Sequence, residues 1–366
     1  MAVTRYHGLI FSKKSQQRLG AQTGGQRPLT NRSEERIDGV RFDQPLLKLP
    51  LRFCADTLAS EIRALPPQAW EPHPQRFPGN EAVPLVTPAG QITNDFAGPM
   101  GPTEFLLKCP YVMEAMAEIG AVWGRGRLMG LGAGAEVPLH VDANYYWRTH
   151  IRFHIPVITN PEVDFTCGGM TVNMAPGECW VFDTFRQHHV HNRGSEQRIH
   201  LVFDTVGGER LWDLIDAAQR GDLNGGETAL IALGDGTGGE LAYEQFNYPK
   251  VMSPWELRCH IDELVVLAID EPPLEAVRRR LDRLIAGWSA AWTMFDTSDA
   301  GLPTYRRLLA SVRDDLQSIG GEAITMSNTR PLYQVLEKFV FDNLIASPRV
   351  EESKAKAALA EQRRGS

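Results

Sequence analysis

The histidines of this chain are concentrated in one part of the sequence. There are 10 in 366 residues, and most of them lie between His140 and His200. Two groups stand out in this window, His140-Val141-Asp142 and His188-His189-Val190-His191. Imidazole and carboxylate groups bind divalent metal ions, so we expect the chemistry of the protein to lie here.

The spacing of His140 and Asp142 suits a metal site on a β-strand. Side chains two residues apart on a strand point the same way, so both can take adjacent positions around one ion. A third ligand from another strand completes one face of an octahedron and leaves the opposite face for a bidentate cosubstrate and O2. Two neutral imidazoles and one carboxylate suit Fe(II). An H-x-D motif alone also occurs on surface turns, so its surroundings must support the hypothesis.

Two segments carry basic side chains at every second position. In 148–155 the even positions are Arg or His, and most odd positions are apolar. The same alternation returns in 198–203, which begins with Arg198. Each strand therefore has a cationic face and a core face. The cationic faces are either solvated or line a barrel interior that holds a dianion, and a fixed guanidinium at Arg198 can bind a carboxylate through two hydrogen bonds.

The pattern of elements changes near Gly208. Before it, short apolar runs broken by Gly and Pro predict an antiparallel sandwich or barrel. After it, helical spacing of apolar residues predicts a mostly helical region. We expect strands near 127–131, 148–157, 178–182 and 198–204, and helices at 209–220, 254–270, 273–292, 304–319 and 331–345. The expected organisation is an extended lead-in at 1–41, a β domain at 42–208, a helical region at 209–348 and a charged tail at 349–366.

Composition excludes several classes of protein. The 38 Lys and Arg residues against 45 Asp and Glu give a net charge of −7, which argues against a nucleic-acid or anionic-membrane binder. No run approaches the ~18 apolar residues of a membrane span, and the first residues lack the apolar core of a signal peptide. The 5 cysteines are scattered without a C-x-x-C motif. A protein of the reducing cytoplasm is therefore expected.

Three ordered stretches carry a more specific pattern than the single motifs. They are RLMGLGAGAEVPLHVDANYYW, RFHIPVITNPEV and MAPGECWVFDTFRQHHVHNRGSEQRIHLVFD. Together they resemble the aspartyl/asparaginyl β-hydroxylase family of Fe(II)/2-oxoglutarate dioxygenases, and they are similar to bacterial proline cis-hydroxylases. The resemblance implies a mainly β core, a double-stranded β-helix of the cupin-like jelly-roll type, with the helical region following it. It also implies iron ligands at His140, Asp142 and His188.

The same resemblance implies a cosubstrate site and a reaction. It assigns 2-oxoglutarate binding to Arg198, and to Arg152 and His154 in the R-x-H strand, while Met129 stands where some members have a serine. The implied reaction consumes O2, releases succinate and CO2, and hydroxylates an amino-acid side chain that is free, carrier-tethered or part of a peptide. Asp142 favours hydroxylation over halogenation, because a halide needs the position that this carboxylate occupies.

The second histidine ligand has to be chosen among neighbours. Alternation places His188 with Val190 on one face and His189 with His191 on the other, without showing which face looks inward. The family pattern H-x-V-x-N fits a ligand at His188. This position also has the same parity as Arg198, although a turn can break such parity. The alternative is that His191 binds the metal.

Two other functions use the same residues. One is a non-catalytic cupin-like module that binds a small acid, and the presence of all three ligands argues against it. The other is a zinc hydrolase, but zinc prefers tetrahedral sites and no general-base Glu accompanies the histidines as in H-E-x-x-H. The apolar stripes of the helical region predict that it covers the barrel mouth or forms a homodimer interface.

Overall fold

The computed structural model describes residues 44–74, 76–142, 145–220, 229–231, 240–269 and 272–364. The expected lead-in at 1–41 lies outside the described residues. The described residues form one compact unit.

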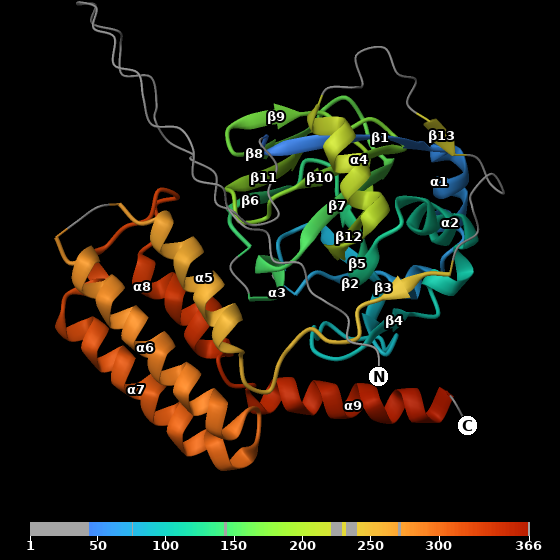
Figure 1. Cartoon of the computed structure of the whole chain (residues 1–366). Helices are drawn as coiled ribbons and strands as arrows, with labels where there is room; N and C mark the ends of the chain where they lie inside the picture. The colour runs from blue at the N-terminus through green and yellow to red at the C-terminus, as the bar shows by residue number, and fades with distance from the viewer. Residues whose placement is uncertain are drawn as a thin grey trace, which may run out of the picture. The chain divides into compact units, whose positions relative to one another are not determined.

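A 10-stranded sheet forms the larger layer of the β domain (Figure 1). Its order is β13-β1-β10-β7-β12-β5-β3-β2, with β4 beside β3 and β14 beside β5, and all pairs are antiparallel except β1 with β13 and β5 with β14. The strands are β1 (Leu46–Phe53), β2 (Glu71–Pro72), β3 (Asn80–Pro88), β4 (Met100–Pro102), β5 (Val122–Leu131), β7 (Ile151–Ile158), β10 (Glu178–Phe182), β12 (Arg198–Gly207), β13 (Ala229–Ile231) and β14 (Ala242–Tyr243).

A second, 4-stranded sheet has the order β6-β11-β8-β9. Its strands are β6 (Glu136–His140), β8 (Val163–Cys167), β9 (Met170–Val172) and β11 (His188–Asn192). From β5 to β12 the chain moves repeatedly between the large and the small sheet, which is the winding of a double-stranded β-helix. The predicted fold class is confirmed.

The two faces of the large sheet differ in chemistry. Its outer face packs against α1 (Ala55–Arg63), α2 (Pro110–Ile119) and α4 (Glu209–Gln219), in one core cluster that includes Phe153 and Phe203. The face toward the small sheet carries the buried polar side chains of β5, β7 and β12. The alternation noted in the sequence therefore separates an apolar core from a polar interior.

Helices dominate the chain after the β domain. Helices α5 to α8 pack on one another through a second core cluster centred on residues such as Leu281 and Trp288 (Figure 1). The helices are α5 (Pro254–Val266), α6 (Leu274–Phe295), α7 (Leu302–Ser318), α8 (Leu332–Val335) and α9 (Pro348–Arg364). No helix in the described part of the chain is long and apolar enough to cross a membrane.

Two predicted elements differ from the structure. The strand expected at 148–157 begins only at Ile151, because a helical turn, α3 (Tyr145–Arg148), precedes it. The hydroxyl of Tyr146 in this turn accepts a 2.7 Å hydrogen bond from the backbone N–H of Arg125, which fixes the turn against β5. The helix expected at 331–345 is interrupted, since α8 continues into a π turn at Leu336–Val340 and a 3-10 turn at Phe341–Asn343.

Candidate active site

Three metal-binding side chains meet at one end of the small sheet. His140, Asp142 and His188 each offer a ligand atom, and these atoms lie within 4.8 Å of one another. Strand register explains the meeting, because His140 at the end of β6 is paired directly with His188 in β11. Asp142 follows two residues later, with its Oδ1 3.6 Å from His140 Nε2 and its Oδ2 4.0 Å from His188 Nε2.

Backbone carbonyls orient both imidazoles. Nδ1 of His140 lies 2.7 Å from the carbonyl oxygen of Pro138, and Nδ1 of His188 lies 2.8 Å from that of Arg186. With the Nδ1 protons donated in this way, each Nε2 lone pair faces Asp142. Burial lowers the pKa of His188 to about 4, so this imidazole is neutral near pH 7, as a metal ligand must be. The donor set fits a divalent metal of the Fe(II) type.

A buried arginine connects the triad to the large sheet. Arg152 Nη1 donates a 2.5 Å hydrogen bond to Asp142 Oδ2. Its Nε and Nη2 donate to the two carboxylate oxygens of Asp204, at 2.8 and 3.3 Å. Trp147 Nε1 also donates to Asp204, at 3.1 Å, and the Arg152 guanidinium lies over the Trp147 ring. Asp204 therefore fixes Arg152, and Arg152 fixes the Asp142 oxygen that lies on the His188 side.

A second buried arginine has no carboxylate partner in the described part of the chain. Arg198 Nη2 lies 2.7 Å from His200 Nδ1, and Arg198 Nε has no hydrogen-bond partner. His200 Nδ1 in turn lies 3.4 Å from His154 Nδ1. Burial lowers the pKa of Arg198 to about 9, and burial followed by the charge of Arg198 lowers the pKa of His154. The guanidinium of Arg198 can therefore neutralise an entering anion.

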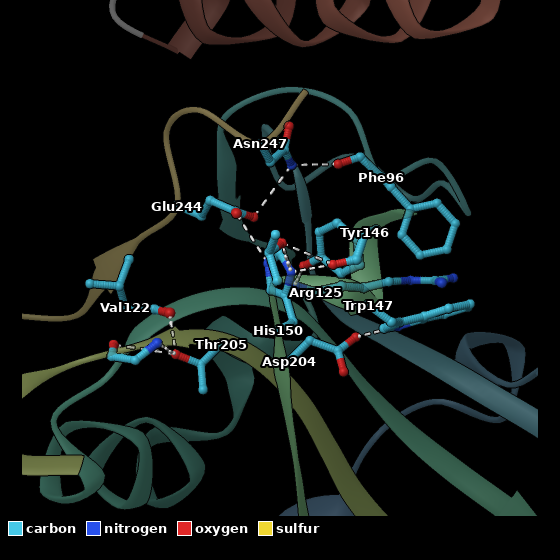
Figure 2. Close-up of polar contacts among 12 residues, drawn as sticks. Phe96, Val122, Arg125, Tyr146, Trp147, His150, Asp204, Thr205, Glu244 and Asn247 are labelled. Carbon is cyan, nitrogen blue, oxygen red and sulfur yellow. Dashed lines mark hydrogen bonds and ion pairs between the residues drawn. The ribbon is translucent and has the colours of Figure 1, made fainter. Parts of the chain in front are cut away.

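A buried contact between His150 and Glu244 lies next to the turn that follows the triad (Figure 2). His150 Nε2 is 3.0 Å from Glu244 Oε1, and the His150 ring stacks on Tyr146 with centroids 3.8 Å apart. Asn247 Nδ2 donates to the other oxygen of Glu244 and to the carbonyl of Phe96. His150 therefore supports the wall of the site and does not face the triad.

Comparison with known proteins identifies the β domain. Residues 101–207 match the family model described as aspartyl/asparaginyl beta-hydroxylase. The resemblance found in the sequence is confirmed over these residues. No curated protein matches the chain.

Solved structures with related β cores resemble parts of the chain. An oxidoreductase of the 2OG-Fe(II) oxygenase family from Burkholderia pseudomallei is 13% identical, covers 43% of this chain and 80% of its own, and has a TM-score of 0.34. A Pseudomonas putida prolyl-4-hydroxylase is 14% identical, covers 44% of this chain and 93% of its own, and has a TM-score of 0.32. A predicted oxalate decarboxylase from Thermotoga maritima is 21% identical over 25% of this chain and 71% of its own, with a TM-score of 0.20.

Most of the residues expected from the sequence lie together in the β domain. The triad is assembled, His188 faces it, and His191 is only half-buried on the other face of β11. His154 lies near Arg198 through His200, whereas Arg152 is bound to Asp142 and Asp204. Sequence reasoning missed Asp204, His200, Arg125 and Arg127. Period-two alternation could have found the first two, because they share parity with Arg198 on β12.

Proposed function

We propose that the domain is an Fe(II)/2-oxoglutarate-dependent dioxygenase that hydroxylates an amino-acid-type side chain and releases succinate and CO2. The observation that carries the proposal is a three-donor metal site beside a buried arginine without a carboxylate partner among the described residues. Such a pair of sites suits a cosubstrate that binds the metal at one end and carries a carboxylate at the other.

The residues of the chain then have distinct tasks. His140, Asp142 and His188 would hold the iron through three donors, and the iron would supply the O2 chemistry. Arg198 binds the distal carboxylate of 2-oxoglutarate, and neutral His154 and His200 line this pocket without adding charge.

Arg152 acts through Asp142 in this proposal. The sequence places it among cosubstrate-binding residues, but its Nε, Nη1 and Nη2 all donate to the carboxylates of Asp204 and Asp142. We therefore assign it a positioning role, in which it holds Asp142 Oδ2 on the His188 side so that Oδ1 stays on the His140 side.

The helical region contributes to the site. Val141, Tyr145 and Phe185, which flank the triad residues along the chain, belong to the core cluster of α5 to α8. Tyr145 donates a hydrogen bond to Glu256 of α5, and the rings of Phe185 and Phe339 meet edge to face. These contacts support the expectation that the helices cover the loops at the barrel mouth.

Succinate formation tests the proposal. Purified protein with Fe(II), ascorbate and 2-oxoglutarate is expected to form succinate slowly alone and faster with the correct substrate. A panel of amino acids, free and in peptides, is screened for a mass increase of about sixteen, the mass of one oxygen atom. Protein that binds the metal but forms no succinate with any member of the panel would leave only the binding-module function.

A further inference from the structure

Two further arginines face the barrel interior from β5. Arg125 and Arg127 are buried and alternate with Gly124 and Gly126. Gly126 points to the outer face, where a Cβ would lie 2.4 Å from the Phe203 ring, so its neighbour Arg127 points inward. Arg125 lies at a register shift of β5, and the charges of Asp204, Arg152 and Asp142 act on its guanidinium. A Cβ at Gly124 would lie 2.2 Å from the Tyr146 hydroxyl, so the small residue lets this ring approach the backbone.

Neither of these arginines has an ion-pair partner among the described residues. Arg125 Nη2 donates to Asn94 Oδ1 at 3.1 Å, and its guanidinium lies 4.3 Å from the centre of the Phe96 ring (Figure 2). Arg125 Nε and Arg127 Nη1 are buried without a hydrogen-bond partner. Burial lowers the pKa of Arg125 to about 10 and also lowers the pKa of Arg127. Holding both charges therefore costs free energy in the ligand-free protein.

These arginines belong to the metal side of the interior and not to the Arg198 site. Arg127 is paired with Val202, four positions along β12 from Arg198, or about 13 Å at ~3.3 Å per residue. The charges that act on Arg127 are Arg125, Arg152, Asp204 and the triad carboxylate Asp142. In the proposed function a 2-oxoglutarate dianion places one carboxylate at the metal and the other at Arg198. Arg125 and Arg127 then still lack a counter-charge.

We propose that Arg125 and Arg127 bind a carboxylate of the prime substrate, which makes this an enzyme for substrates with a free carboxylate and not for amides or thioester-tethered residues. The inference rests on the proposed function. The unpartnered Nε and Nη1 groups donate to the carboxylate, and Asn94 and Phe96 hold Arg125 in place. Because the same charges reach Asp142, the bound acid lies beside the metal.

Inorganic sulfate is the first probe. The full-length protein is loaded with Mn(II) and 2-oxoglutarate without O2 and titrated with sulfate by calorimetry. Wild type and the surface control Arg193→Gln are expected to bind sulfate equally, and Arg127→Met about tenfold to a hundredfold more weakly, the range for a charge-assisted bond. Equal affinity in Arg127→Met, or competition between sulfate and 2-oxoglutarate, would overturn the proposal.

A melting measurement separates binding from a structural role. Ligand-free Arg127→Met is expected to melt at or above the wild-type temperature, because a buried charge without a partner has been removed. A lower melting temperature would show that Arg127 supports the fold and would overturn the proposal.

Matched acids and amides are the second probe. L-proline with L-prolinamide, and L-aspartate with its diamide, are compared for their stimulation of succinate formation. The acids are expected to stimulate at least tenfold more strongly, and equal stimulation by the amides would overturn the proposal. The sulfate titration needs no turnover. A protein that forms no succinate but loses sulfate binding with Arg127→Met would therefore refute the dioxygenase and retain the anion site.

Discussion

Replacing Asp204 by Asn tests how the metal site is supported. The change keeps the shape of the side chain but removes the charge that faces Arg152 Nε and Nη2. Both partners are buried, and breaking a buried pair by removing one partner costs about 3–5 kcal/mol of unfolding free energy. Arg152 then keeps only Asp142 as a partner. We expect the affinity for the divalent metal to fall roughly tenfold to a hundredfold, as for other residues that orient ligands.

Urea unfolding measures the loss of unfolding free energy in Asp204→Asn, and metal titration measures the loss of metal affinity. The matched control is Glu275→Gln, which removes a carboxylate from an exposed ion pair with Arg279 and is expected to cost less than about 0.5 kcal/mol. Unfolding free energy and metal affinity that both stay at wild-type values in Asp204→Asn would refute the role given to this residue.

The unfolding free energy measured at acidic pH gives a third test of Asp204. Burial alone would raise the pKa of Asp204, but the charge and hydrogen bonds of Arg152 outweigh burial and lower it. The stabilisation from this carboxylate is therefore complete above its unfolded pKa of about 3.9 and is lost as the pH falls through the lower folded pKa. Asp204→Asn is expected to lose less stability than wild type over this acidic range, and a parallel loss would contradict the assignment.

Three other changes test the site and its surroundings. Arg198→Ala is expected to raise the KM for 2-oxoglutarate about tenfold to a hundredfold, because a charge-assisted bond in a buried site is lost; an unchanged KM would mean that the distal carboxylate binds elsewhere. His188→Ala is expected to abolish Fe(II) binding and succinate formation, whereas His191→Ala keeps measurable metal binding by titration; the reverse pattern would move the ligand to His191. Truncation after Pro249 is expected to reduce solubility or activity, since it removes α5 to α9; a soluble and fully active fragment would show that these helices are dispensable.

Local alternation and the family motifs predicted the triad and the direction of Arg198. The directions of His188 and Arg198 depend on period two within one strand, which the structure keeps in β11 and β12. The expectation that Asp142 shares a strand with His140 is wrong, because β6 ends at His140 and Asp142 lies two residues beyond it. The pairing of Arg152 with Asp204 depends instead on the register between β7 and β12. Register is set by the whole sheet, so no single segment contains that information.

Long-range contacts also explain why some predicted elements differ from those in the structure. The turn at Tyr145–Arg148 depends on a hydrogen bond to the backbone of Arg125, which the local pattern of 148–157 does not contain. Likewise, Glu244 becomes a buried partner of His150 although it follows a Gly-rich segment that gives no indication of a role. Propensity and periodicity describe neighbours in sequence, and these features are made by neighbours in space.

The loops that carry the triad share their hydrophobic core with the helices at the other end of the chain. Val141 lies between two of the ligands, and Phe185 lies three residues before the third, yet both are buried with residues of α5 to α8. Metal binding and helix folding are therefore thermodynamically linked, and each must strengthen the other by the same free energy. Binding of an ion at the triad therefore raises the melting temperature of α5 to α8, although the ion makes no contact with them. By the same linkage, local unfolding of these helices weakens ion binding.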